Sequence, residues 1–496
     1  MNIVILGAGQ VGSSLARNLA SEDNDITIID TNVSALRELR EKLDIHTRQG
    51  AASHPDVLEQ ANVNDADMLI AVTNSDEVNM MACQIAYSLF RTPTRIARVR
   101  ASGYLQHPEL FTPELIPVDV LISPEQLITN YIYRLISNPG TTQVLDFAEG
   151  KVRLVAVKAF HEGPMVGHEI QEISEHLPEV KVRVAAIFRQ GKAIIPNGHT
   201  VIEANDEIFV IASAQHIRAI VSELRSVDRP YKRIMIAGGG NVGRRLANAL
   251  EEGRYKVKII EKSPETAKDL AETLNKTIVL EGDAADEALL LEENIDETDI
   301  FCALTNDDEA NILSAMLAKR LGARKVMSLV NRTVYVDLVE SANIDHAVSP
   351  QQITIGALLT HVRSGDIVSV HSLRKGAAEV IEVIAHGDAK NSRVVGRKRE
   401  DLKLPPGATV GAIVRDDEVI MPHHDTVIEE NDHVILFLAD KRYISAVEKM
   451  FQVGLGHIYN DTSISYAIIY HTAHPWFIDG SFQFYHVATC GSWMVL

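Results

Sequence analysis

An internal duplication is the feature that most limits how this chain can fold. Ile3–Gly12 reads IVILGAGQVG, and Ile234–Gly243 reads IMIAGGGNVG at a distance of 231 residues. A second pair of segments, Val184–Asp206 and Val410–Asp432, matches without a gap at a distance of 226 residues. The segments keep the same order in both halves, so a two-part unit has been copied, and both copies must share one architecture.

The two parts of each copy differ in their apolar pattern. The pattern of the first part predicts a large α/β domain. The pattern of the second part predicts short alternating strands separated by turn residues and followed by a helix. We therefore predict an α/β chain with two Rossmann-like parallel-sheet domains, residues 1–137 and 231–362, each followed by a small α+β domain, residues 142–226 and 368–453. Residues 454–496 belong to neither copy, and their abrupt change of composition is typical of an added, non-native tail.

Composition excludes several classes of partner. The chain has 48 basic and 67 acidic residues, a net charge of −19, and no stripe of Lys and Arg, so nucleic acid is not an expected partner. No run of 18 apolar residues and no signal sequence occurs, which predicts a chain that neither crosses a membrane nor is secreted. Cys83, Cys302 and Cys490 are not clustered, which argues against disulfides and structural zinc and fits a reducing cytosol.

The motif that carries chemistry is a glycine-rich turn between a predicted strand and a predicted helix. Asn2–Leu6 is an apolar run, and Ser13–Leu19 has helical apolar spacing. In this context the first glycine makes a tight turn, the second lets the backbone approach phosphates, and the third lets the helix press on the strand. The helix N-terminus supplies free N–H groups to an anion, so the predicted phosphate loop comprises Gly7, Gly9, Gln10, Val11 and Gly12.

A carboxylate follows each glycine motif at the same spacing. Asp30 ends the next predicted strand, where its oxygens can accept hydrogen bonds from the ribose 2′- and 3′-hydroxyls, and it would repel the 2′-phosphate of NADP. The second copy repeats this arrangement in Gly238, Gly240, Asn241, Val242, Gly243 and Glu261. The alternative is that one or both glycine loops are only structural turns.

Two further pairs of residues are candidates for the same sites. Thr73 and Asn74, with Thr305 and Asn306 in the second copy, follow an apolar strand at the sheet edge where ligands of open α/β sheets bind. The alternative for Asn74 is a helix N-cap with Glu77 reaching back, and the second copy offers Asn306 and Glu309 for this role.

Arg98 and Arg100 alternate with apolar residues, so both point to one face of a strand and can bind additional phosphates. The alternative is a solvated edge face. At a distance of 232 residues, Val330 stands in the place of Arg98 and Arg332 in that of Arg100, which predicts that the two sites prefer different phosphate loads.

These motifs, namely GAGQVG with Asp30, AVTNSDE, ARVR and the duplicated small domain, resemble the RCK (regulator of conductance of K⁺) or KTN domain family over residues 1 to 453. The resemblance implies a cytoplasmic ring, a homotetramer, at the inner face of the plasma membrane, which gates a potassium channel or transporter of the TrkH type. It also implies NAD(H), ATP and ADP as ligands. The first site would be lined by Gly7, Gly9, Gly12, Asp30, Thr73, Asn74 and Arg98, with Arg100 beside them.

The main alternative function is an NAD-dependent dehydrogenase, which needs a proton-transfer group beside the nicotinamide. The histidines of the two small domains do not correspond, since His199 aligns with Asp425, so we expect no catalysis and no metal site. A second alternative is an anion or divalent-cation site at the turns Asp206-Glu207 and Asp432-His433, which we interpret as solvated hairpin ends.

Overall fold

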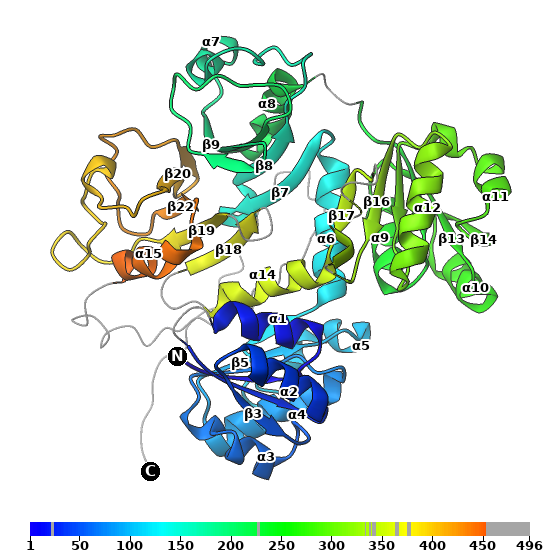
Figure 1. Cartoon of the computed structure of the whole chain (residues 1–496), viewed down its shortest axis with the longest axis vertical. Coiled ribbons are helices and arrows are strands. Elements are labelled where there is room, and N and C mark those ends of the chain that lie inside the picture. Colours follow the sequence, from blue (N-terminus) through cyan, green and yellow to red (C-terminus); the bar gives the residue numbers. More distant parts are fainter. Residues whose placement is uncertain are drawn as a thin grey trace, which may run out of the picture.

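A computed structural model of the chain describes residues 1–20, 24–225, 229–332, 334–336, 339, 344–362, 367–373 and 378–452 (Figure 1). The predicted tail at 454–496 lies outside the described residues. Within the described residues, no helix combines the length and the apolar character needed to span a bilayer.

Two parallel six-stranded sheets form the larger folds, which we call the first and second nucleotide folds after the motifs they carry. The first sheet has the order β3-β2-β1-β4-β5-β6 and the second β14-β13-β12-β15-β16-β17. The central strands are buried on both faces, which is why the sequence shows continuous apolar runs such as those of β1 and β4. Strand order reverses between β1 and β4 in the first sheet, and this reversal creates the position where α/β folds bind ligands.

The elements of the two folds follow each other in the same order. The first comprises β1 (Asn2–Leu6), α1 (Gln10–Leu19), β2 (Asp25–Asp30), α2 (Val33–Lys42), β3 (His46–Gln49), α3 (Pro55–Gln60), β4 (Met68–Ala71), α4 (Asp76–Ile85), β5 (Thr94–Arg98), α5 (Ser102–Leu105), β6 (Val120–Ile122) and α6 (Pro124–Ser137). The second comprises β12 (Arg233–Ala237), α9 (Asn241–Glu251), β13 (Lys256–Glu261), α10 (Pro264–Thr273), β14 (Ile278–Glu281), α11 (Glu287–Glu292), β15 (Ile300–Ala303), α12 (Asp308–Arg320), β16 (Lys325–Leu329), β17 (His346–Val348) and α14 (Pro350–Val362).

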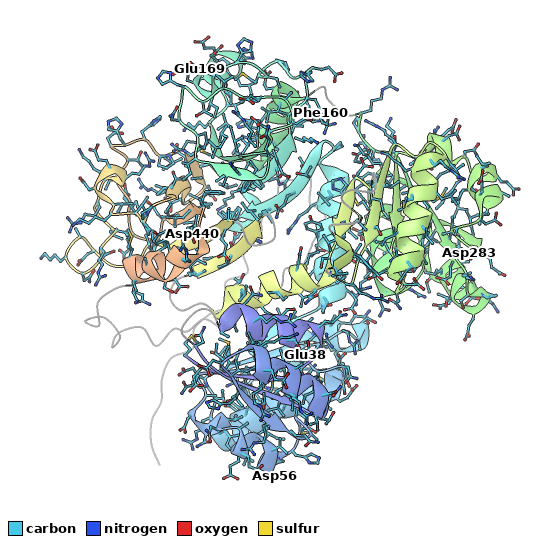
Figure 2. All side chains as sticks on the ribbon, in the orientation of Figure 1. Glu38, Asp56, Phe160, Glu169, Asp283 and Asp440 are labelled. Atoms are coloured by element: carbon cyan, nitrogen blue, oxygen red, sulfur yellow. The ribbon has the colours of Figure 1, made fainter. Side chains whose placement is uncertain are left out.

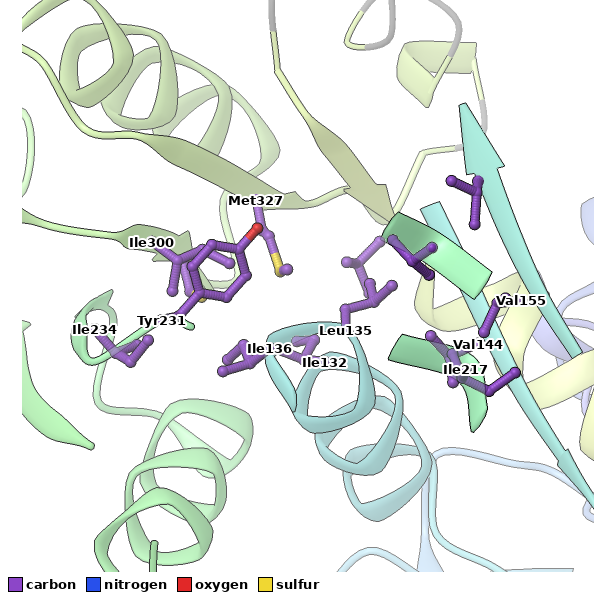
Figure 3. Packing of buried hydrophobic residues seen from close by; sticks show 14 of the residues in the cluster. Ile132, Leu135, Ile136, Val144, Val155, Ile217, Tyr231, Ile234, Ile300 and Met327 are labelled. Carbon is purple, nitrogen blue, oxygen red and sulfur yellow. The ribbon is translucent and has the colours of Figure 1, made fainter. Parts of the chain in front are cut away.

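The last helix of each nucleotide fold packs against the other fold. Helix α6 lies along α9, and its Ile132 and Ile136 share a core with Ile234 and Tyr231 (Figure 3). Helix α14 lies along α1 (Figure 1), and its Leu358 joins the core of the first fold. The two folds therefore exchange one helix each within a single chain.

Two small antiparallel sheets complete the molecule. The first small module contains β7 (Thr141–Phe147), β8 (Val152–Lys158), α7 (Ile173–His176), β9 (Val182–Arg189), β10 (Lys192–Ile194), β11 (Glu207–Ser213) and α8 (Ile217–Leu224). The second contains β18 (Ile367–Leu373), β19 (Ala378–Ile384), β20 (Ala408–Arg415), β21 (Glu418–Ile420), β22 (His433–Leu438) and α15 (Ile444–Phe451). Phe147, Phe209 and Phe437 belong to one cluster that joins the two modules. The predicted fold class, two Rossmann-like sheets and two small α+β modules in tandem, is confirmed.

Acidic side chains occur on several separate parts of the molecule. Glu38 and Asp56 lie on the first nucleotide fold, Asp283 on the second and Asp440 on the second small module (Figure 2). The first three of these residues are exposed, as expected for carboxylates that have no buried partner.

Candidate functional site

The first glycine turn has the geometry that the motif predicts. Gly7 has a φ of +105°, which favours glycine, and its N–H donates to the carbonyl of Ile29 at 2.8 Å. A Cβ on Gly12 would stand 1.9 Å from the Gly7 carbonyl oxygen, whereas a Cβ on Gly9 would meet nothing within 4 Å. The turn therefore needs glycine at 7 and 12 for its own packing, and it leaves open space at Gly9.

The second glycine turn has almost the same geometry. Gly238 has a φ of +104°, and a Cβ on Gly243 would stand 2.0 Å from the Gly238 carbonyl oxygen. A Cβ on Gly240 again meets nothing within 4 Å. Gly239 is specific to this copy, because a Cβ there would stand 2.2 Å from Leu270 Cδ1.

The residues after each turn begin a helix that has no side-chain cap. Gly9 and Gly240 are the N-caps of α1 and α9, and neither helix has an acidic residue in its first turn. Gln10, Val11, Asn241 and Val242 are the first residues of these helices, so their backbone N–H groups have no partner in the preceding turn of the helix. The open space at Gly9 and Gly240 thus adjoins the positive end of a helix dipole, as a phosphate group requires.

The predicted carboxylates lie against the glycine turns. Asp30 accepts hydrogen bonds from the N–H groups of Ala8 at 2.6 Å and Asn32 at 2.7 Å. Glu261 accepts equivalent bonds from Gly239 at 2.7 Å and Ser263 at 2.8 Å. Each carboxylate oxygen can accept a further hydrogen bond, so these side chains brace the turn and can also bind a ribose hydroxyl.

Thr73 and Thr305 are held by buried asparagines that our sequence reasoning missed. Asn79 is fully buried, and its Oδ1 accepts from Thr73 N at 2.9 Å and from Thr73 Oγ1 at 2.7 Å. Its Nδ2 donates to the Arg98 carbonyl at 2.9 Å and so joins β4 to β5. Asn311 makes the equivalent contacts with Thr305. Both asparagines occupy the same place in the repeated segments AVTNSDEVNM and ALTNDDEANI, which was the signal available in the sequence.

The interpretation of Asn74 and Asn306 as helix caps was wrong. Ser75 is the N-cap of α4 and accepts from Val78 N at 3.3 Å, and Asp307 is the N-cap of α12 and accepts from Ala310 N at 2.9 Å. Both asparagines stand one residue earlier and are exposed. This position leaves the Asn74 side chain exposed at the end of the strand beside the first turn.

Arg98 is the last residue of β5, an internal strand, so the solvated-edge interpretation was wrong for Arg98. Arg100 lies two residues beyond the end of this strand, and its side chain is 40% exposed. Strand β5 pairs with β4 and with β6. Arg98 Nη2 donates to the Thr73 carbonyl at 2.6 Å, while within the described structure its Nε is buried without a hydrogen-bond partner. Burial, and then the nearby Arg100, lower the pKa of Arg98. Arg100 Nη2 donates to the Asn74 carbonyl, and Arg100 Nε lies 3.8 Å from Asp76 Oδ1. An added anion at this position would relieve the repulsion between the two guanidinium groups.

The residues that correspond to these arginines in the second copy differ from the prediction. Val99 N donates to Ile122 O at 2.9 Å, and Val330 N donates to Val348 O at 2.9 Å, so Val330 corresponds to Val99. Leu329 therefore stands where Arg98 does, and Asn331 where Arg100 does. Arg332 lies one residue further on and pairs with Glu309 at 3.2 Å.

The reason for this shift is a π-helical turn at Ala86–Phe90, directly after α4. Thr92 N donates to the Ala86 carbonyl, whereas in the second copy Ala323 N donates to Ala318. The π turn accommodates one extra residue in the first copy, so the distance between equivalent residues falls from 232 to 231 before β5 begins.

The carboxylate turns of the small modules are buried ion pairs, which corrects their interpretation as solvated hairpin ends. Asp206 is 1% exposed and accepts two bonds from the Arg189 guanidinium, at 2.9 and 2.8 Å. Asp432 is 0% exposed and pairs with Arg415 in the same way. Because these carboxylates are occupied by arginine forks, the turns offer no ready site for a divalent cation.

The two described cysteines and two of the isolated histidines lie away from any reactive arrangement at the glycine turns. Burial raises the pKa of the Cys83 and Cys302 thiols to about 12, so neither is a thiolate at neutral pH. His168 pairs with Glu172 at 2.8 Å and His433 with Glu382 at 2.6 Å, and both lie in the small modules rather than at a glycine turn. Among the described residues no group of three or more His, Cys, Asp or Glu could hold a metal ion.

Comparison with known proteins agrees with this architecture. The TrkA-N domain model matches residues 3–124 and 234–350, and the TrkA-C domain model matches residues 153–225 and 388–452. The Trk system potassium uptake protein TrkA of Halomonas elongata is 60% identical over 455 residues, covering 92% of this chain and 99% of the relative. The TrkA protein of Vibrio alginolyticus is 59% identical over 453 residues, covering 91% and 99%.

Solved structures share the fold at low sequence identity. The GsuK RCK domain aligns with a TM-score of 0.57 and 20% identity, covering 91% of this chain and 94% of that one. The GsuK channel bound to NAD aligns with a TM-score of 0.57 and 20% identity, covering 91% and 78%. These likenesses show that the chain shares the fold of the GsuK RCK domain. The chain belongs to the TrkA family of Trk system potassium uptake proteins.

Proposed function

We propose that this chain is a nucleotide-sensing regulatory subunit that gates a membrane potassium channel or transporter of the TrkH type. The observation that carries the proposal is the pair of glycine turns, each with open space at its middle glycine, a helix N-terminus and a bracing carboxylate. The names of the relatives supply the potassium uptake system, and the chain's own sites supply the ligand class.

The ligands we propose are NAD(H) and the adenine nucleotides ATP and ADP. Backbone N–H groups after Gly9 would hold the diphosphate, Asp30 would accept from the ribose hydroxyls, and Thr73 and Asn74 would lie at the edge of the base or sugar. The GsuK channel that shares this fold was solved bound to NAD, which supports the same ligand class here.

The two sites would differ in the charge of the ligand they prefer. The first site has Arg98 and Arg100 beside Thr73, whereas the second has Leu329 and Asn331 at these positions. Two cations at these positions of the first site, and none at the equivalent positions of the second, favour the more highly phosphorylated ligand at the first. A change of ligand at the first site can shift the shape of the molecule only if the two ligands favour different shapes.

Self-association into a ring, as a homotetramer at the cytoplasmic face of the plasma membrane, is part of the same proposal. Met81 on α4 and Leu313 on α12 occupy equivalent positions, and they are 52% and 63% exposed. Exposed apolar side chains repeated in both copies suit a repeated contact between subunits. We further propose that the domains end at residues 137, 226, 362 and 453.

Replacing Asp30 tests the first site. We expect Asp30→Ala to weaken ATP binding by about tenfold or more, because a charged acceptor for ribose hydroxyls is lost. The chain should still fold, with a somewhat lower Tm because the N–H groups of Ala8 and Asn32 lose their acceptor. Isothermal titration of the full chain measures the affinity, and potassium flux through a TrkH-type partner in liposomes measures gating. Glu261→Ala is the matched control, since it alters only the second site. An unchanged ATP titration for Asp30→Ala would remove Asp30 from the site.

Replacing Arg98 tests whether this residue makes the first site distinguish ATP from ADP. We expect Arg98→Ala to weaken ATP by about 10- to 100-fold and ADP by less, because a charge-assisted hydrogen bond is lost. Arg332→Ala is the control, since the structure pairs Arg332 with Glu309 and not with a site. Equal losses for ATP and ADP would defeat this role for Arg98.

Catalysis is the competing proposal, and it has a direct test. A dehydrogenase would oxidise NADH steadily with a keto acid at catalytic protein concentrations. A sensor would bind NADH without a steady loss of the absorbance of the reduced nicotinamide.

A further inference from the structure

Gln351, in the first turn of α14, is bonded to the start of α1. Its side-chain amide donates to the carbonyl of Gln10 at 3.1 Å and to the hydroxyl of Ser14. Gln10 is the residue after Gly9, so this contact reaches the first glycine turn from a segment more than three hundred residues away in sequence. Figure 1 shows α14 lying along α1.

Helix α14 joins this contact to the second small module. Ile355, Leu358, Leu359 and Val362 of α14 are buried in the core of the first nucleotide fold, so the helix moves with that fold. The same helix packs against β18, a strand of the second small module. A helix of 13 residues spans roughly 20 Å, enough to carry a displacement from the glycine turn to this sheet.

The corresponding junction in the second half is built differently. Helix α6 contacts α9 through Gln126 Oε1, which accepts from Arg245 Nη1 at 3.1 Å. Arg245 lies one turn after the start of α9, and the structure describes no hydrogen bond from α6 to Asn241, the counterpart of Gln10. Among the described contacts, the hydrogen bond from an exchanged helix to the first residue after the middle glycine is therefore found in the first nucleotide fold and not in the second.

We propose that Gln351 couples nucleotide binding at the first glycine turn to the second small module. Binding at the first site would then alter the structure of the small module that belongs to the second half of the chain. Gln351 is a positioning residue, because it acts through the Gln10 carbonyl and the α1 helix rather than on the nucleotide. This inference rests on the proposed nucleotide binding. Coupling of this kind is reciprocal, so a shift of α14 would also alter affinity at the first site.

Hydrogen–deuterium exchange of the full chain, with and without saturating ATP, tests this coupling. In the wild type we expect ATP to slow exchange both at the start of α1 and in β18. In Gln351→Ala the slowing at α1 should remain, whereas the slowing in β18 should fall by at least about half, since the link between them is cut. Gln352→Ala, an exposed neighbour on the same helix, should respond like the wild type.

The possible outcomes separate this inference from the proposed function. An unchanged β18 response in Gln351→Ala, or a wild type that protects α1 but not β18, would overturn the coupling and leave nucleotide binding intact. A wild type that shows no heat of ATP or NAD binding would overturn the proposed function, and the coupling with it. Gln351→Glu, which keeps the size but removes the donor, should reproduce the loss if Gln351→Ala proves unstable.

Discussion

At the scale of single residues, the structure distinguishes the glycines that the fold needs from the glycine that a ligand would need. Gly7 and Gly12 are needed by the fold, because a Cβ on Gly12 would stand 1.9 Å from the Gly7 carbonyl. Gly9 is not needed by the fold, since its φ of −70° suits any residue and a Cβ there meets nothing within 4 Å. A glycine that the fold does not require points to a requirement of the ligand.

These two glycines give a paired prediction. We expect Gly12→Ala to lower the free energy of unfolding by about 1–3 kcal/mol, because the helix must move away from the strand. Gly9→Ala should leave that free energy unchanged within about 0.5 kcal/mol and still weaken nucleotide binding, because its methyl group occupies the space beside the phosphates. Urea unfolding and isothermal titration measure the two effects. A Gly9→Ala variant with unaltered affinity would contradict the phosphate loop.

At the scale of elements, the exchanged helices place part of each core in the opposite half of the chain. Leu358 of α14 is fully buried against the first nucleotide fold. We expect Leu358→Ala to cost about 2–5 kcal/mol and to speed hydrogen exchange in β1 and α1, although it lies in the second half of the sequence. Leu291→Ala on α11 is the control, because Leu291 is 51% exposed. Faster exchange confined to the second nucleotide fold would contradict this assignment of Leu358.

At the scale of the whole molecule, three shared cores hold the two halves together. Helices α6 and α14 are exchanged, and the small modules share the cluster around Phe147, Phe209 and Phe437. We expect residues 1–226 and 227–496, expressed together as separate chains, to copurify through a tag on one of them. Each half alone would expose the apolar face of its exchanged helix and should not elute as a single species from a sizing column. Two halves that are each stable alone and do not bind each other would contradict this organisation.

The sequence by itself determined the duplication, the fold class and the position of both glycine turns with Asp30 and Glu261. These features depend on local backbone geometry and on apolar periodicity, which are written in consecutive residues. The buried asparagines at 79 and 311 were also visible in the repeat, but their importance depends on a carbonyl of the next strand, which sequence spacing does not reveal.

The tertiary structure alone decided three further points. Leu329, and not Val330, is the structural counterpart of Arg98, because a π turn adds one residue to the first copy. A comparison of the two copies at a fixed distance in sequence cannot place such a turn. The burial of Asp206 beneath Arg189 depends on where chain segments meet. The exchange of α6 and α14 has the same origin, because an apolar helix face specifies that it must be covered and not which surface covers it.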